Sequence, residues 1–140
     1  MIDRYVNETA VRVRYAETDQ MGIAHHSVYL VWCELGRTQL MRGLGVTYRD
    51  LEDAGIRLPV VEVKLRCRAP ARYDEVLTVR SWVRLCRSRQ VQFGNAITLQ
   101  DKLLATAEIT LVAIGEDYST VSIPTSVREL LVAVPDPIRL

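Results

Sequence analysis

The chain has 140 residues, the size of one ordinary domain, and its net charge of +1 excludes the strongly basic character typical of nucleic-acid-binding domains. Hydrophobic residues make up 49% and charged residues 25% of the chain, a balance typical of globular proteins. The sequence shows no run of about 18 apolar residues that would span a membrane, and no signal-peptide pattern. We therefore expect one domain over residues 1–140 and no membrane insertion.

Cys33, Cys67 and Cys86 are odd in number and show neither a Cys-x-x-Cys pair nor the spacing of a disulfide framework. Cysteines of this kind favour a reducing compartment. Together with the absence of a signal peptide, they predict a cytoplasmic location.

Residues 10–15 form the first predicted element, a strand. Val11, Val13 and Tyr15 alternate there with Arg12 and Arg14, which is the period of two that a strand requires. Residues 17–22 are rich in turn-forming residues and lead into a helix.

That helix is predicted over residues 27–44, and it is apolar around most of its circumference. Only a narrow stripe is strongly polar, formed by Glu34, Arg37, Thr38 and Arg42. A helix with this pattern is buried on nearly all sides, so we expect it to form the centre of the core. A short helix over residues 47–54 follows and stops at Gly55.

Four further strands are predicted between residues 61 and 113, because each segment has one apolar and one polar face. Trp82 is the exception, since it lies on the polar side of its strand. A short helix is expected within residues 124–131. Five antiparallel strands and one long apolar helix predict an α+β fold in which the sheet wraps around the helix. The residues of the apolar faces are Val61, Val63, Leu65, Cys67 and Ala69; Val79, Val83 and Leu85; Val91, Phe93, Ile97 and Leu99; and Ala105, Ala107, Ile109, Leu111 and Ala113.

Asp19 lies in the loop just before the buried helix, and this position can carry chemistry. The first N–H groups of a helix are free and partially positive, so they can stabilise an oxyanion. A nearby carboxylate can attack a carbonyl or activate water. Gly22 permits a close approach or a positive φ angle in this loop. On spacing alone, however, an aspartate before a helix more often serves as a turn or capping residue.

The segment resembles the signature of a known family. The matching residues are Tyr15, Thr18, Asp19, Gly22, His26, Tyr29, Leu30, Glu34 and Arg37, and residues 68–75 resemble the family's stretch before its third strand. The family is the 4-hydroxybenzoyl-CoA thioesterase-like family, especially its Tol–Pal-associated acyl-CoA thioesterase branch. The resemblance implies the hotdog fold, an antiparallel five-stranded sheet wrapped around one long central helix. It also implies hydrolysis of the thioester bond of a small-to-medium acyl-CoA.

The resemblance also implies roles for single residues. Asp19 matches the family's catalytic carboxylate, described as a nucleophile or a general base. The backbone N–H of His26 matches the group that polarises the thioester carbonyl, and Tyr15 matches a tyrosine that lines the site. Gly22 and Tyr29 match motif positions that we assign to substrate binding.

Coenzyme A is expected as part of the substrate, and neither a cofactor nor a metal is expected. Proteins of this family have active sites at a dimer interface, so the resemblance implies a homodimer or a homotetramer. CoA phosphates rest against basic residues in such proteins, and the local candidates are Arg87, Ser88 and Arg89, between two predicted strands. A solvated turn explains these three residues equally well.

Several alternatives stay open. A hotdog enzyme that acts on acyl carrier protein, a dehydratase with His26 as its base, and a non-catalytic acyl-CoA-binding protein all fit the same fold. Glu17 is expected to face solvent, and Cys33 is expected in the core. His25 and His26 are expected to point in different directions, without the partners of a metal site.

Overall fold

The structure, a computed structural model, describes residues 4–140. Its strands are β1 (Val6–Arg12), β2 (Val60–Cys67), β3 (Val76–Cys86), β4 (Gln90–Leu99) and β5 (Lys102–Val112). Its α-helices are α1 (His26–Gly43), α2 (Tyr48–Asp53) and α3 (Thr125–Arg128), and a short 3-10 helix, η1, spans Tyr15–Glu17. No helix in this described part of the chain is long and apolar enough to cross a membrane.

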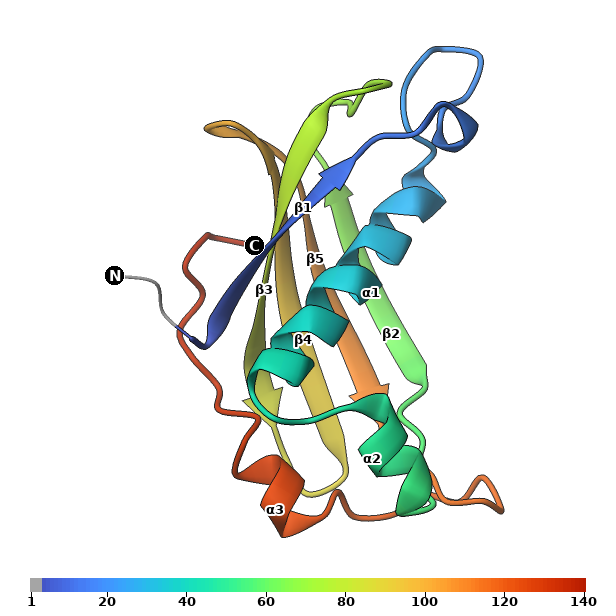
Figure 1. Cartoon of the computed structure of the whole chain (residues 1–140), viewed down its shortest axis with the longest axis vertical. Helices are drawn as coiled ribbons and strands as arrows, with labels where there is room; N and C mark the ends of the chain where they lie inside the picture. Colours follow the sequence, from blue (N-terminus) through green and yellow to red (C-terminus); the bar gives the residue numbers. More distant parts are fainter. Residues whose placement is uncertain (1–3) are drawn as a thin grey trace.

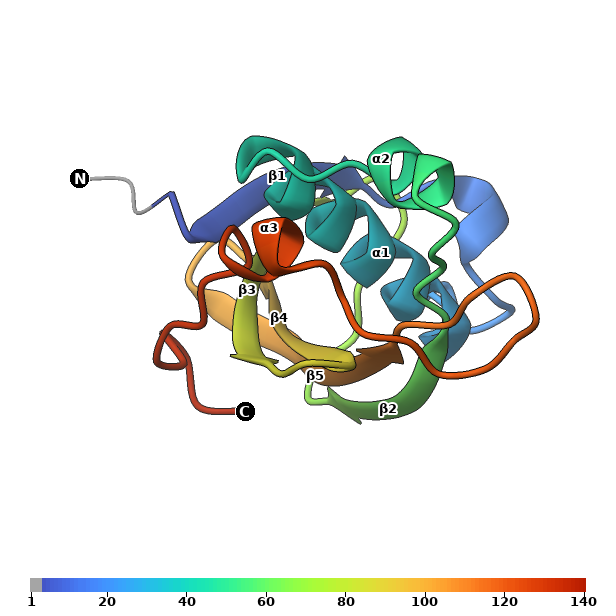
Figure 2. The ribbon, with the colours of Figure 1, turned by 90° about the horizontal axis from the view of Figure 1, so that it is seen from below.

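The five strands form one antiparallel sheet in the order β1-β3-β4-β5-β2. The sheet curls around α1, which runs diagonally across its concave face (Figure 1; Figure 2). This arrangement confirms the expected α+β architecture of a sheet wrapped around one long helix.

The core lies between α1 and the inward-facing residues of the three central strands. Trp32, Leu40 and Met41 of α1 are almost completely buried. Each large apolar side chain buried in this way contributes roughly 1.5–3 kcal/mol. The strand residues that face them are Leu77, Val79, Val83, Val91, Phe93, Ile97, Ile109 and Leu111.

Gly36 allows α1 to approach β3 closely. A Cβ atom at this position would overlap Ser81 Oγ and would lie 3.0 Å from Val79 Cγ1. Ser81 is itself held by Asn95, whose Nδ2 donates a hydrogen bond of 2.7 Å to Ser81 Oγ. A glycine is therefore needed here for packing, although it lowers the intrinsic helix propensity of α1.

Three expectations from the sequence are corrected. The first strand covers Val6–Arg12, and Tyr15 belongs to η1, because the chain turns after Arg12 although the alternation continues. The long helix is not buried all round, since Val31 is 51% and Leu35 is 47% exposed. Arg37 of the polar stripe is buried instead, with its Nε donating to the Tyr48 hydroxyl at 3.3 Å.

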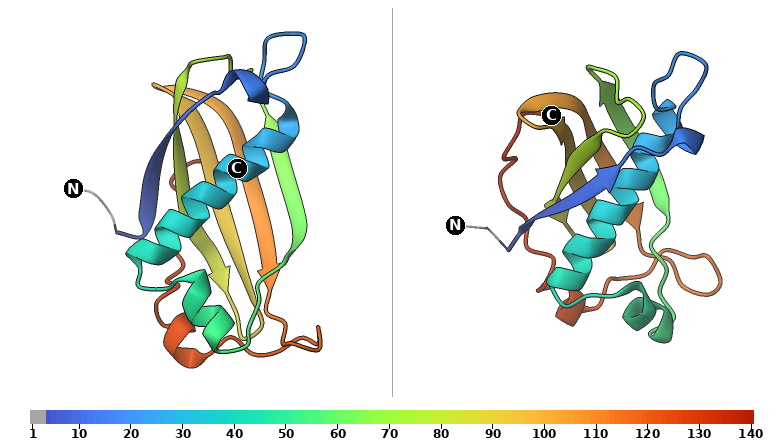
Figure 3. Two further views of the ribbon diagram at one scale, coloured as in Figure 1. Left: turned by 45° about the vertical axis from the view of Figure 1, so that its right-hand side comes forward. Right: turned by 45° about the horizontal axis from the view of Figure 1, so that its top comes forward.

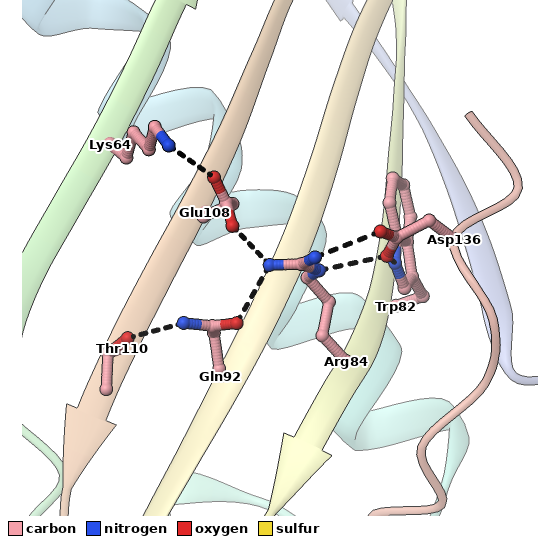
Figure 4. A network of polar contacts seen from close by, with 7 residues as sticks. All are labelled: Lys64, Trp82, Arg84, Gln92, Glu108, Thr110 and Asp136. Carbon is pink, nitrogen blue, oxygen red and sulfur yellow. Dashed lines mark hydrogen bonds and ion pairs between the residues drawn. The ribbon is translucent and has the colours of Figure 1, made fainter. Parts of the chain in front are cut away.

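The outer face of the sheet explains why a tryptophan occupies a polar position. Trp82 is fully buried there, because Gly94 on β4 leaves room for its ring. The C-terminal segment covers it, and Asp136 accepts hydrogen bonds of 2.9 Å from both Trp82 Nε1 and Arg84 Nε. Arg84 also pairs with Glu108 of β5 (Figure 4). Residues far apart in sequence therefore bury Trp82 and accept the hydrogen bond of its indole N–H.

Candidate functional site

Two loops meet beyond the N-terminal end of α1, one formed by residues 13–25 and one by residues 68–75 (Figure 1; Figure 3). The Val13 N–H donates to the Glu75 carbonyl at 2.9 Å. The Ala24 N–H donates to the Ala71 carbonyl at 2.8 Å, and Ile23 bridges to Arg72. Segments that are more than 40 residues apart in the sequence thus form one end of the molecule.

Asp19 begins a tight turn inside the first loop. Its Oδ1 accepts the Met21 N–H at 2.8 Å, and its carbonyl accepts the Gly22 N–H at 3.0 Å. Gly22 has a φ of 76°, the left-handed conformation that suits glycine at the end of such a loop. The carboxylate is partly exposed, and no hydrogen bond or ion pair within residues 4–140 involves Oδ2. Asp19 is thus a turn residue with one carboxylate oxygen, Oδ2, that has no partner among the described residues.

His25 and His26 form the start of α1. His25 is the N-cap, with an extended backbone, and its Nδ1 accepts the Ser27 N–H at 3.2 Å. His26 is the first helical residue, and its backbone N–H has no hydrogen-bond acceptor among the described residues. This N–H is one of the free donors that every helix N-terminus presents.

The two histidine rings stack, with centroids 4.3 Å apart and planes 32° apart. The expectation that they point in different directions was wrong. The pair lies across a helix boundary: His25 is the extended N-cap, with φ −63° and ψ 142°, and His26 is the first helical residue. Neither the alternation of a strand nor the spacing of a helix therefore applies to it.

A cavity of about 430 Å³ lies between the start of α1 and the end of β2. Asp19, His26 and Tyr29, three of the residues predicted from the motif, all line it. Gly22 shapes the adjoining turn. The other lining residues are Met21, Ile23, Ala24, His25, Cys67, Arg68, Ala69 and Pro70. The motif therefore brings its carboxylate, its helix N-terminus and a tyrosine to one cavity.

Tyr29 closes the inner side of this cavity. It is only 3% exposed, and its ring packs edge-on against Trp32 with centroids 5.3 Å apart. Its hydroxyl accepts the Ala71 N–H at 3.3 Å. Burial raises the pKa of Tyr29 above its ordinary value, so the hydroxyl is neutral at physiological pH. The cavity thus ends at a fixed aromatic ring.

Two residues of the first loop lie differently from expectation. The Tyr15 ring is 77% exposed and stands outside the cavity, against the ring of Tyr73. Glu17 is buried, which corrects the expectation that it faces solvent. Its Oε1 accepts the Arg14 N–H at 2.8 Å, so it closes the turn of η1.

Arg87, Ser88 and Arg89 lie in the β3–β4 hairpin, at the opposite end of the sheet (Figure 1). The Ser88 carbonyl accepts the Ile123 N–H at 2.7 Å, which ties this hairpin to the C-terminal segment. Within one chain, these three residues do not join the cavity.

The cysteines and possible metal ligands add little to the site. Cys33 is buried in the core, where desolvation raises its pKa to about 12, so its thiol is no nucleophile. Cys67 lines the cavity and is exposed, and partial desolvation raises its pKa. Over residues 4–140, no group of three or more His, Cys, Asp or Glu side chains is placed to hold a metal ion.

Reasoning from the sequence missed Arg68, the cationic residue that lines the cavity. It begins the stretch of residues 68–75 that resembles the family, so a signal was present. Arg68 and Asp19 lie on two loops that meet only in the folded chain. Their spacing in the sequence therefore does not show that they line the same cavity.

Comparison with known proteins gives consistent matches. The sequence profile described as "Thioesterase-like superfamily" matches residues 13–131. YneP of Bacillus subtilis is 46% identical over 79 residues, which are 56% of this chain and only 57% of YneP. The acyl-CoA thioester hydrolase YbgC of Escherichia coli is 28% identical over 105 residues, which are 74% of this chain and 78% of YbgC.

Among solved structures, the crystal structure of a hypothetical protein, TT1821, from Thermus thermophilus matches with a TM-score of 0.84. It is 37% identical in sequence, and the match covers 89% of this chain and 96% of that one.

Proposed function

Because the chain belongs to the thioesterase-like superfamily, we propose that it hydrolyses acyl-CoA thioesters that carry a small-to-medium acyl group. The observation that carries this proposal is the cavity that Asp19 and His26 both line, at a helix start where the His26 N–H has no hydrogen-bond acceptor among the described residues. The similarity to YbgC, which is named an acyl-CoA thioester hydrolase, supports CoA as the thiol carrier.

The reaction would begin with the thioester carbonyl oxygen at the N-terminus of α1. There the His26 N–H would donate to it, and the helix dipole would favour the negative charge that develops on attack. Asp19 would either attack the carbonyl carbon and form an anhydride, which water then opens, or take a proton from the attacking water. In both cases CoA leaves as its thiol and the acyl group as a carboxylate. The Met21 N–H would fix the orientation of the carboxylate through Oδ1.

The proposed size of the acyl group follows from Tyr29. Because this ring is buried, held at its hydroxyl and backed by Trp32, we expect it to limit how far an acyl chain reaches along α1. Met21, Ile23 and Pro70 offer apolar contacts to a short chain or a small ring.

We further propose that the protein assembles as a homodimer. β2 is an edge strand, paired only with β5 within the described sheet, so its outer backbone groups are free to pair with another strand. Val61 is 58% and Val63 is 41% exposed on it. Val31 and Leu35 of α1 are exposed as well, so a second copy would bury apolar surface from both elements. Pairing of dimers into a tetramer and the cytoplasmic location stay predictions.

A panel of acyl-CoA esters tests the proposed activity, with release of free thiol as the readout. We expect turnover that is fastest with short aliphatic or small aromatic acyl groups. If the protein hydrolysed acyl carrier protein thioesters but no CoA thioester, its substrate would be the acyl carrier protein ester. Binding of CoA esters without any turnover would contradict the proposal and support a binding role.

A further inference from the structure

Arg37 of α1 carries a buried positive charge that has no carboxylate partner among residues 4–140. It is only 5% exposed. Its Nε donates to the Tyr48 hydroxyl, and its guanidinium carbon lies 6.0 Å from the centre of the Phe93 ring, but neither contact neutralises the charge. Because a buried charge without a counter-charge is costly, arginines this buried are normally paired with a carboxylate. The counter-charge of Arg37 therefore has to come from outside the described chain.

Glu34 lies one turn before Arg37 on the same helix and is the opposite case. It is exposed, and it takes part in no ion pair within the described residues, although residues three apart on a helix are near enough to pair. Both side chains line a crevice of about 230 Å³ between α1 and β2. One surface of the protein thus presents a carboxylate and a guanidinium group that leave each other unpaired.

The crevice lies at the middle of the two elements that form it, and its other walls are apolar. Glu34 and Arg37 are near the middle of α1, and Val63 is near the middle of β2. A two-fold axis that passes through the crevice and across β2 would pair the free edge of β2 with its own copy, antiparallel, and would bring two α1 helices side by side. In such a contact the same surface of each copy faces the other. The apolar lining residues are Leu30, Val31, Val60, Val63 and Ile109.

Resting on the proposed homodimer, we propose that Arg37 of each protomer forms an ion pair with Glu34 of the partner subunit. The surface is self-complementary, because it offers one charge of each sign and the two-fold axis presents it to its own copy. The apolar walls would exclude water from both ion pairs, which strengthens them. A small free anion is a poorer occupant, because Glu34 beside Arg37 would repel it. The two ion pairs would also fix the register of the paired β2 strands, since a shift along the strand would separate the charges.

Charge reversal tests this proposal through the strength of the dimer, measured by sedimentation equilibrium over a range of protein concentrations. We expect Glu34→Lys and Arg37→Glu, each alone, to raise the dissociation constant at least about tenfold, because like charges then meet. An equimolar mixture of the two variants should form a heterodimer with about the affinity of the parent protein, since opposite charges meet again at both positions. Glu129→Lys is the matched control, because it makes the same charge change on an exposed carboxylate outside the crevice, and it should dimerise like the parent.

Thermal unfolding verifies that each variant folds, which matters because Arg37 is buried. If Arg37→Glu does not fold, Arg37→Met and Glu34→Gln replace the reversals in a double-mutant cycle, and the double variant should dimerise no more weakly than the weaker single variant. Effects that multiply in this cycle, or a mixture that stays as weakly associated as its components, would overturn the ion pair and leave the homodimer standing. A parent protein that is monomeric would overturn both. Because these measurements use no substrate, a failure of the proposed hydrolysis shows separately, in the thiol-release assay.

Discussion

At the scale of single residues, the motif predicted Asp19, His26 and Tyr29, which share the cavity, but also Tyr15, which lies outside it. Asp19, His26 and Tyr29 lie within one short segment, so their proximity follows from a turn that leads into a helix. The burial of Glu17 and the approach of Arg68 depend on a second loop that arrives from elsewhere in the chain. Such long-range contacts leave no periodic signal in the sequence.

Tyr29 gives a prediction at this scale about acyl specificity. We expect Tyr29→Leu to extend the cavity and to shift the preferred acyl-CoA toward longer chains. Tyr29→Phe is the matched control, since it keeps the ring and leaves only the Ala71 N–H without its acceptor. That change should cost about 1–3 kcal/mol of stability and leave the preference unchanged. Chain-length profiles of the three proteins are the measurement, and identical profiles would refute the role of Tyr29.

At the scale of elements, the apolar pattern predicted α1 and four of the strands. In β2, however, the apolar residues Val61 and Val63 are exposed, so its apolar face does not lie in the core. The pattern failed for β1, where the alternation continues to Tyr15, past the end of the strand. It also could not explain Trp82, whose burial depends on the C-terminal segment around Asp136. The failures at β1 and Trp82 arise where tertiary contacts outweigh local pattern.

The packing of α1 on β3 is tested by two alanine substitutions in the same helix. Gly36→Ala should destabilise the protein by about 1–3 kcal/mol, since the added Cβ overlaps Ser81 Oγ and crowds Val79. Gly43→Ala meets no atom within 4 Å and should be neutral or stabilising by less than about 1 kcal/mol. Urea unfolding measures both, and equal effects would show that helix propensity, not the close approach, determines the result.

The C-terminal segment should make stability depend on pH through Asp136. Partial burial raises the pKa of this carboxyl, but the hydrogen bonds from Arg84 and Trp82 and the charge of Arg84 outweigh it and lower the pKa. A lowered pKa stabilises the fold above the ordinary carboxyl pKa, and the contribution is lost as pH falls through the lowered value. Asp136→Asn should therefore destabilise the protein near neutral pH by about 1–3 kcal/mol, and less in acid. Unfolding at several pH values should show the two proteins converge at low pH, and a gap that does not change with pH would contradict this role.

At the scale of the whole molecule, the free edge of β2 and the exposed residues of α1 give the protein one unpartnered apolar side. Val63 lies with Val31 and Ile109 around a crevice between these two elements. We expect Val63→Arg to convert the proposed dimer to a monomer, because a charge would enter the proposed contact. Glu62→Arg places the same side chain on the other face of the strand and should leave the dimer intact. Sedimentation equilibrium is the measurement, and a parent protein that is already monomeric would overturn the proposed assembly.

The most direct test of the central claim is the steady-state hydrolysis of an acyl-CoA by the parent protein and by Asp19→Asn. Asparagine keeps an oxygen for the Met21 N–H, so the turn and the thermal stability should be preserved. It has no negative charge for attack or proton transfer, so kcat should fall at least about 100-fold. Full activity of a folded Asp19→Asn variant would show that hydrolysis does not depend on this carboxylate.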